Sequence, residues 1–208
     1  MWGAAATTRT AAAFGERAQT GGMSAPWAVE QPIETERLRL RPHRMSDVDD
    51  LLRFHSDPEV VRYLPWPVRD RPAVLETLAV KVGQHRAEQP GDWLVLAIEL
   101  RADADHPAAA DRDRVIGEVL IKRAGEHDPA DETELGFAIA REAWGGGLAG
   151  EAARAMLELA AGWGLHSAVA VVAPENEGSR RLVAKLGFEP DGTVVRRGLD
   201  LLRFRREL

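Results

Sequence analysis

The chain has 208 residues, which corresponds to one domain at roughly 150 residues per domain. It contains no Cys, and this excludes a disulfide framework, a thiolate zinc site, an iron–sulfur cluster and a cysteine nucleophile. The formal net charge of −6 argues against general nucleic-acid binding. The longest apolar runs, such as residues 93–98, are far shorter than the ~18 residues that a membrane span needs. We therefore expect a soluble globular protein with neither a nucleic acid nor a membrane as its partner.

The first 28 residues are rich in Ala, Thr and Gly and show no helical or strand periodicity. Arg9 and Arg17 are not followed by the apolar core of a secretory signal, so we expect the protein in the cytoplasm. The composition predicts a disordered tail over residues 1–28 and one folded domain over residues 29–208. Met23, which follows two glycines, is an alternative to Met1 as the start of the natural chain.

Hydrophobic periodicity predicts one strand and two helices in the first part of the domain. Residues 37–41 alternate Arg with Leu, which is the period of a strand. Ser46 and Asp49 have the spacing of a capping box, so a helix is expected to start at Ser46. Prolines place a loop over residues 57–67, and Pro72 is expected to open the second helix. The expected buried stripe of that helix consists of Leu75, Leu78, Val82 and His85.

The rest of the chain is predicted to alternate strands with helices. Alternating or continuous apolar residues predict strands over residues 93–100, 114–123, 133–140, 168–173, 188–196 and 199–207. A helix over residues 148–163 follows a glycine-rich turn, and Asn176 is placed to cap a last helix that ends at Leu186. The predicted order, β-α-α-β-β-β-α-β-α-β-β, is that of an α/β domain with a mixed sheet.

The turn before the helix at 148–163 carries four glycines, Gly145, Gly146, Gly147 and Gly150. Glycines there let backbone N–H groups approach an anion, and the helix start adds unpaired N–H groups and a positive dipole end. The turn therefore predicts a phosphate or pyrophosphate cradle. Gly145, Gly147 and Gly150 also satisfy G-x-G-x-x-G, the fingerprint of a dinucleotide-binding oxidoreductase. That match is weak, because the acidic residue expected ~20 positions later is absent around Ala170.

A second interpretation of the glycine turn accounts for more of the chain. The residues from Trp144 to Ala152 resemble the acetyl-CoA loop of the GNAT superfamily of N-acetyltransferases, most closely the branch of ribosomal-protein N-acetyltransferases. Further resemblance lies, in the right order, in residues 35–41, 56–66, 176–179 and 185–188. It covers residues 33–208 and implies a mixed, mostly antiparallel sheet whose central strands splay apart.

The resemblance implies acetyl-CoA as co-substrate and no metal. The residues implied to bind acetyl-CoA are Phe137, Ala138, Ile139, Trp144, Gly145, Gly146, Gly147, Leu148, Ala149, Gly150, Asn176 and Ser179. Trp144 stands where most members have Arg or Gln. The strand at 133–140 would pair with the pantetheine, and the glycine turn would hold the pyrophosphate.

The implied reaction is a direct attack of a primary amine on the acetyl thioester. Glu134 is the first candidate for the general base: it lies on the strand that would meet the thioester, and its face carries only small residues beyond it. Glu118, on the preceding strand, is the second candidate. Many members use a Tyr to protonate the thiolate, but Val183 occupies that position here, so Ser179 is the candidate acid.

The acceptor is expected to be an amine-bearing small molecule or a peptide N-terminus. Arg62, Tyr63 and Trp66 lie in the loop that borders the acceptor groove in this superfamily, although Trp66 can equally anchor a proline-rich loop. The six His residues show no metal-binding spacing. Two other functions remain open: a domain that holds acetyl-CoA without turnover, and the oxidoreductase. A homodimer also remains open.

Overall fold

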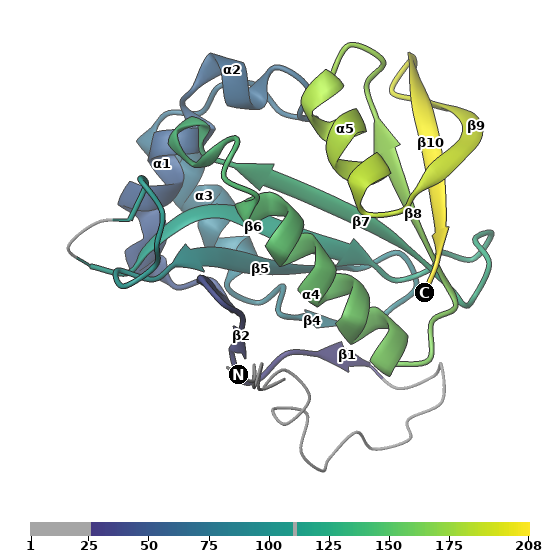
Figure 1. The fold of residues 1–208 in the computed structure, drawn as a ribbon, viewed down its shortest axis with the longest axis horizontal. Coiled ribbons are helices and arrows are strands. Elements are labelled where there is room, and N and C mark those ends of the chain that lie inside the picture. The colour runs from purple at the N-terminus through teal and green to yellow at the C-terminus, as the bar shows by residue number, and fades with distance from the viewer. Residues whose placement is uncertain (1–25, 110–111) are drawn as a thin grey trace, which may run out of the picture.

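The computed structural model describes residues 26–109 and 112–208 (Figure 1). Its main sheet has eight strands in the order β2-β3-β5-β6-β7-β8-β10-β9, and β1 pairs with β4 in a separate two-stranded ribbon. The strands are β1 (Trp27–Ala28), β2 (Ile33–Glu34), β3 (Leu38–Arg41), β4 (Arg86–Ala87), β5 (Trp93–Leu100), β6 (Arg114–Lys122), β7 (Glu132–Ile139), β8 (Ser167–Val172), β9 (Glu189–Arg196) and β10 (Leu199–Glu207). The helices are η1 (Met45–Asp47), α1 (Val48–His55), α2 (Pro58–Val61), α3 (Arg71–Lys81), η2 (Arg141–Ala143), α4 (Leu148–Gly162) and α5 (Glu177–Lys185). The predicted mixed, mostly antiparallel sheet is confirmed.

Helices cover both faces of the sheet, and α4 crosses one face while α1 and α3 lie behind the other (Figure 1). Strand alternation sends Leu96 and Val119 toward α4, and it sends Ala97 and Ala138 toward α1 and α3. Two hydrophobic clusters result, one on each face, and both consist largely of fully buried aliphatic side chains. The site described below lies where these layers leave the sheet open.

β7 and β8 are the adjacent pair that runs parallel in the main sheet, and they diverge. Their pairing covers three positions and ends at Glu134 opposite Val169, although β7 continues to Ile139 and β8 to Val172. Beyond Glu134 the backbone groups of the two strands no longer meet each other. The splayed sheet implied by the sequence is therefore present, with Glu134 at its apex.

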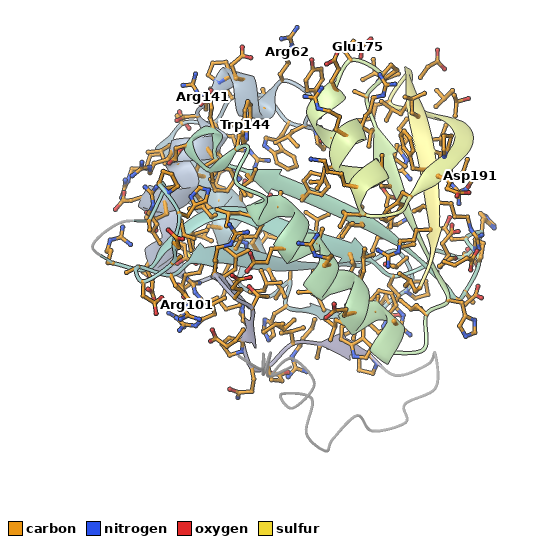
Figure 2. The ribbon with its side chains drawn as sticks, viewed as in Figure 1. Arg62, Arg101, Arg141, Trp144, Glu175 and Asp191 are labelled. Carbon is orange, nitrogen blue, oxygen red and sulfur yellow. The ribbon has the colours of Figure 1, made fainter. Side chains whose placement is uncertain are left out.

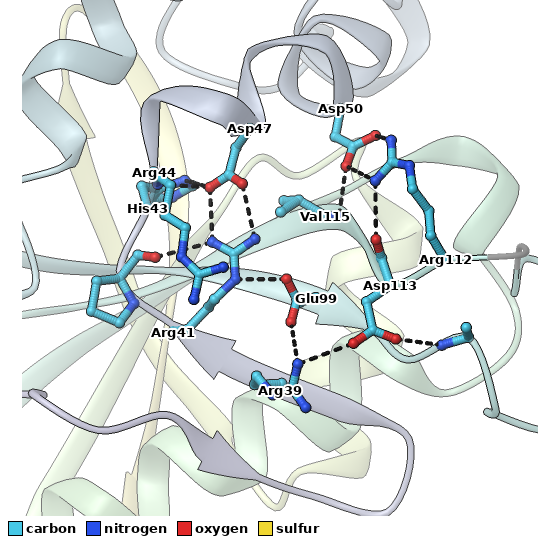
Figure 3. A network of polar contacts seen from close by, with 12 residues as sticks. Arg39, Arg41, His43, Arg44, Asp47, Asp50, Glu99, Arg112, Asp113 and Val115 are labelled. Atoms are coloured by element: carbon cyan, nitrogen blue, oxygen red, sulfur yellow. Dashed lines mark hydrogen bonds and ion pairs between the residues drawn. The ribbon is translucent and has the colours of Figure 1, made fainter.

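A buried ion-pair network attaches the start of α1 to the sheet (Figure 3). Arg41 donates to both carboxylate oxygens of Asp47, at 2.8 and 2.9 Å, and to Glu99 on the neighbouring strand at 2.6 Å. Burial alone raises the pKa of Asp47, but its hydrogen bonds from Arg41 and from the Arg44 backbone outweigh burial and lower that pKa. A paired and hydrogen-bonded arrangement of this kind is what keeps buried charges tolerable.

Several local expectations are corrected by the structure. The capping box at Ser46 does not form: residues 45–47 make a 3₁₀ turn, and α1 begins at Val48 because Asp47 is drawn to Arg41 and the Arg44 backbone. The expected loop at 57–67 contains α2, whose first turn Asp57 caps by accepting from the Glu59 N–H.

The buried face of α3 and the start of the ordered chain also differ from expectation. Leu75 is 37% exposed, whereas Lys81 is buried, so the face of α3 is rotated from the predicted stripe, and His85 lies beyond the helix end. Trp27 is buried in β1 and stacks on Trp163 with ring centroids 5.3 Å apart, so the ordered fold begins before residue 29. The expected tail at residues 1–25 lies outside the described residues.

Candidate active site

A pocket of about 630 Å³ opens where β7 and β8 diverge. Its walls come from the end of β7, the glycine loop and first turn of α4, α2 with the loop after it, and α5. Arg62, Trp144 and Glu175 line it and lie close together at the same end of the molecule (Figure 2). Every residue that the sequence assigned to acetyl-CoA except Gly146 lines this pocket.

The glycine loop has the backbone that its composition predicts. Gly145 and Gly147 have φ angles of +81° and +80°, a left-handed conformation that glycine adopts without the cost of a Cβ. Gly147 is the N-cap of α4 and has no side chain that could satisfy the first N–H groups of the helix. Those N–H groups and the positive end of the helix dipole are available to an anion at this end of α4.

Gly146 is needed for a different reason, which the sequence could not indicate. A Cβ on Gly146 would lie 1.8 Å from Nε2 of His106, a side chain from the long loop between β5 and β6. The Gly146 carbonyl accepts from Arg37 Nη1 at 2.9 Å. His106 and Arg37 therefore lie against Gly146, which is not among the residues that line the pocket.

Arg37 and Glu151 hold the glycine loop against the start of the main sheet. Glu151, in the first turn of α4, accepts from the Arg37 backbone N–H at 2.8 Å, from Arg37 Nε at 2.8 Å and from the Thr35 hydroxyl at 2.6 Å. Burial alone raises the pKa of Glu151, but these hydrogen bonds outweigh burial and lower that pKa. The two motifs around residues 35–41 and 144–152, which are remote in sequence, are therefore one structural unit.

Asn176 and Ser179 lie at the start of α5 and both line the pocket. The Asn176 side chain accepts from the Ser179 backbone N–H at 3.0 Å, so the predicted N-cap is confirmed. The Ser179 hydroxyl makes no hydrogen bond within the described residues, so it is available to a ligand in the pocket. Val183, at the position where many relatives carry Tyr, is fully buried in the core.

Trp144 lines the pocket with a side chain that is 49% exposed. Its indole Nε1–H donates to the Ile139 carbonyl at 2.9 Å, at the end of β7. This hydrogen bond uses the polar end of the ring and fixes the ring beside the last residues of the strand. Trp144 therefore shapes the entrance through its apolar surface, whereas Arg or Gln at this position would offer hydrogen-bond donors.

Glu134 lies at the apex of the β7–β8 opening, and its side chain is 12% exposed. Both of its carboxylate oxygens accept from Arg196 of β9, at 2.5 and 2.7 Å, in a bidentate pair. The small residue beside it leaves less room than the sequence suggested, because a Cβ on Gly136 would lie 2.7 Å from Leu120 Cδ1. The Leu120 side chain occupies that space. No local pattern in the sequence indicates Arg196, since 62 residues separate it from Glu134.

Glu118 is fully buried under α1 and α3 and does not line the pocket. It is paired with Lys81, and Nε2 of His43 and of His55 lie 3.8 and 3.9 Å from its Oε2. Burial alone raises the pKa of Glu118, but the Lys81 ammonium and the two imidazoles outweigh burial and lower it. Burial lowers the pKa of His43 to about 4. A carboxylate held in this way is a poor proton acceptor near neutral pH.

The three candidate acceptor residues have different environments. Arg62 and Tyr63 line the pocket, and the Tyr63 hydroxyl donates to the Glu175 carbonyl at 3.3 Å across the entrance. Trp66 does not line it: its ring packs between Arg69, 4.8 Å from the ring centroid, and Lys81, 5.6 Å away. These contacts favour Trp66 as an anchor for its loop, which is the alternative that the sequence left open.

Metal and membrane features are absent from the part of the chain that the structure describes. Within residues 26–109 and 112–208, no group of three or more His, Cys, Asp or Glu side chains is placed to hold a metal ion. Over the same ranges, no helix is long and apolar enough to cross a bilayer.

The chain is similar in sequence and in fold to known acetyltransferases. The family model for the acetyltransferase (GNAT) domain matches residues 37–189. The uncharacterized N-acetyltransferase p20 of Bacillus licheniformis is 28% identical over 166 residues, which cover 79% of this chain and 85% of that protein. Among solved structures, the acetyltransferase (GNAT family) from Bacillus anthracis has a TM-score of 0.67 at 20% identity, covering 85% of this chain and 98% of that one.

RimJ from Mycobacterium smegmatis, solved with CoA-disulfide, has a TM-score of 0.61 at 23% identity and covers 85% of this chain and 86% of its own. The oxidoreductase alternative is therefore wrong. The G-x-G-x-x-G spacing is a coincidence within the glycine loop of a mostly antiparallel sheet, which lacks the successive parallel βαβ units of a dinucleotide-binding fold. The chain belongs to the GNAT family of acetyltransferases, which use acetyl-CoA as the acetyl donor.

Proposed function

We propose that this protein transfers the acetyl group of acetyl-CoA to a primary amine by direct attack on the thioester. The observation that carries the proposal is the pocket at the divergence of β7 and β8, with the glycine loop at one wall and Glu134 at the apex of the opening. The pocket offers unpaired backbone groups to the donor, and Glu134, which does not itself line the pocket, lies at the apex of the β7–β8 opening.

The donor is proposed to lie along this opening. Its pantetheine arm would pair with backbone groups of residues 137–139 on the edge that β8 leaves unpaired, apart from the Ile139 carbonyl, which accepts from Trp144. Its pyrophosphate would bind the N–H groups of residues 145–150 at the start of α4. The Asn176 amide, whose oxygen already caps α5, still has two N–H donors for the pantetheine. Trp144 would pack its ring on the apolar part of the arm.

The chemical step forms one bond and breaks one. The neutral amine nitrogen attacks the thioester carbonyl carbon, the C–N bond forms, and the C–S bond breaks with its electron pair on sulfur. The proton lost by the amine goes to Glu134, and the thiolate takes a proton from the Ser179 hydroxyl or from water. Glu134 accepts that proton in competition with Arg196, which donates one hydrogen bond to each of its oxygens.

Glu118 is the second candidate base and is less suited to the role. It is fully buried, paired with Lys81 and outside the pocket, and its lowered pKa opposes proton uptake. The other open function, a domain that binds acetyl-CoA without turnover, is supported by the buried Val183 in place of a Tyr acid. The thiolate of CoA needs little acid assistance if water reaches it, so this departure does not remove the enzymatic proposal.

We further propose an α-amine, such as a peptide N-terminus, rather than a Lys side chain. An α-amine has a pKa of about 7.7–8.0, against about 10.4 for Lys, so a much larger fraction is neutral near physiological pH. This choice agrees with the sequence resemblance to ribosomal-protein N-acetyltransferases and with the fold shared with RimJ.

The test uses the full chain, acetyl-CoA and a panel of peptides and small primary amines. Free thiol released by turnover is measured, together with acetyl-CoA affinity by calorimetry. We expect thiol release that depends on both the amine and the enzyme. Tight acetyl-CoA binding with no turnover across the panel would favour the non-catalytic domain, and absence of acetyl-CoA binding would contradict the pocket assignment.

A further inference from the structure

The turn between β9 and β10 places two arginines at the edge of the proposed acceptor site. Arg196, the last residue of β9, has a side chain that is 42% exposed and donates to Glu134 from Nη1 and Nη2. Arg197 follows it with a φ of +53° and donates to the Pro65 carbonyl at 2.5 Å, across to the loop after α2. The turn therefore contacts both Glu134 of β7 and the loop that follows α2.

The two arginines of the β9–β10 turn differ in their partners. Glu134 is the carboxylate that pairs with Arg196, while Arg197 forms no ion pair with any residue of 26–109 or 112–208. The hydrogen bonds that Arg196 donates to Glu134 are the largest cause that raises the pKa of Arg196, and Asp128, which accepts from Lys122, adds only a coulombic effect. Within the described residues, Glu134 is therefore the carboxylate that Arg196 contacts, and Arg197 contacts a backbone carbonyl instead.

An acceptor amine that approaches Glu134 from the side of Arg196 competes with the Arg196 guanidinium for the carboxylate oxygens. Bidentate arginine–carboxylate pairs are among the stronger ion pairs. A half-exposed guanidinium that loses its carboxylate partner and gains no other anion is therefore destabilised. A simple amine would neutralise Glu134 and leave Arg196 without an anion. An amine that also carries a carboxylate would give both groups a new partner, and the net charge of the site would not change.

We propose that the acceptor is a primary amine with a carboxylate a few bonds away, and that Arg196 is the residue that selects it. The ammonium is held by Glu134 and the acceptor carboxylate by the Arg196 guanidinium. These two groups are in direct contact in the unliganded protein, so an acceptor can bridge them only if its own charges are close together. This inference rests on the proposed function, because it assigns the specificity of the same site.

Free amino acids and peptides with an acidic first residue share this chemistry, and two sets of matched acceptors separate them. The peptide set compares Asp-Ala-Ala-amide with Asn-Ala-Ala-amide, which have the same shape and differ in one carboxylate. The small-molecule set compares β-alanine with β-alaninamide. Initial rates of thiol release at one pH give kcat and KM for each acceptor, with the acceptor concentration expressed as the neutral amine.

In the wild-type protein we expect kcat/KM to favour the carboxylate member of at least one pair by about tenfold or more, chiefly through KM. Arg196→Gln should abolish that preference: KM for the carboxylate member rises, and KM for the uncharged member stays the same or falls, because Glu134 is no longer occupied. Arg196→Lys, which keeps the charge and loses the bidentate fork, should retain part of the preference.

Arg205→Gln is the matched control. Arg205 lies on β10 of the same hairpin and contacts Glu132 at 3.2 Å rather than Glu134, so its loss should leave the preference intact. The KM for acetyl-CoA should not change in any of these variants. Equal rates for the carboxylate and uncharged members in the wild type, or a preference that survives in Arg196→Gln, would overturn the inference while the proposed function stands. Failure of every amine to be acetylated would contradict the proposed function itself.

Discussion

The two sides of the β7–β8 opening are built in different ways. The donor side consists of backbone: glycines with positive φ angles, the first turn of α4 and strand residues left unpaired. The acceptor side consists of side chains that meet over long sequence distances, as in Arg196 with Glu134, Arg197 with Pro65 and Tyr63 with Glu175. A backbone surface suits a donor that is always the same molecule, whereas side chains can be changed one at a time to select an acceptor.

The largest effect on binding is expected on the donor side, from Gly147→Glu. The substitution puts a side chain at a φ of +80° and a negative charge at the N-terminus of α4, where we place the pyrophosphate. Calorimetry should show acetyl-CoA affinity lowered by roughly a hundredfold or more, since each factor of ten is only about 1.4 kcal/mol. Gly162→Glu is the control: it makes the same change at the other end of α4, where a Cβ meets open space. Unchanged affinity in a folded Gly147→Glu protein would mean that the donor side is misplaced.

The next effect tests the chemistry on the acceptor side. Glu134→Gln keeps the volume and removes the proton acceptor, so kcat should fall by about 10²–10⁴ while acetyl-CoA affinity stays constant. Raising the pH should restore part of the rate if the acceptor is an α-amine, which becomes neutral near pH 8. A kcat within about threefold of wild type at roughly pH 6.5, where an α-amine is mostly protonated, would remove Glu134 from the mechanism and direct attention to Glu118→Gln.

Acid should weaken the fold through the buried imidazoles, which lie beside Glu118 under α1 and α3. The pKa of His43 is about 4 in the folded protein, against 6.5 for the free side chain, so the unfolded chain binds the proton more readily. Stability should therefore fall as the pH drops from about 6.5 toward 4, by about 3 kcal/mol for this residue. Thermal melts across this range provide the measurement. His43→Leu should reduce the fall in melting temperature at acid pH. An identical pH dependence in that variant would exclude His43 as the source of the acid instability.

The smallest effect concerns the attachment of the glycine loop. Arg37→Ala removes the hydrogen bond to the Gly146 carbonyl and the ion pair with Glu151, so the loop loses its support without losing its own residues. We expect KM for acetyl-CoA to rise by about tenfold with kcat nearly unchanged. Arg39→Ala is the control, since Arg39 lies on the same strand and pairs with Glu34, Glu99 and Asp113. Equal changes in both variants would indicate a general loss of sheet stability instead.

The sequence by itself determined the donor side. Positive φ angles at Gly145 and Gly147, the Asn176 cap on α5 and the order of strands and helices along the chain all follow from local backbone chemistry and from hydrophobic period. These signals lie within a few residues of the structure that they specify, and for that reason they could be identified in advance.

Only the tertiary structure decided the acceptor side. Side-chain pairing depends on which segments pack together, and neither the Arg196–Glu134 pair nor the burial of Glu118 with Lys81 leaves a local pattern in the sequence. The same reason explains the errors in α3, where Lys81 is drawn inward by Glu118 and Leu75 turns outward. Local chemistry fixes the backbone that we expect to hold the donor, and long-range packing fixes the charges that an acceptor must meet.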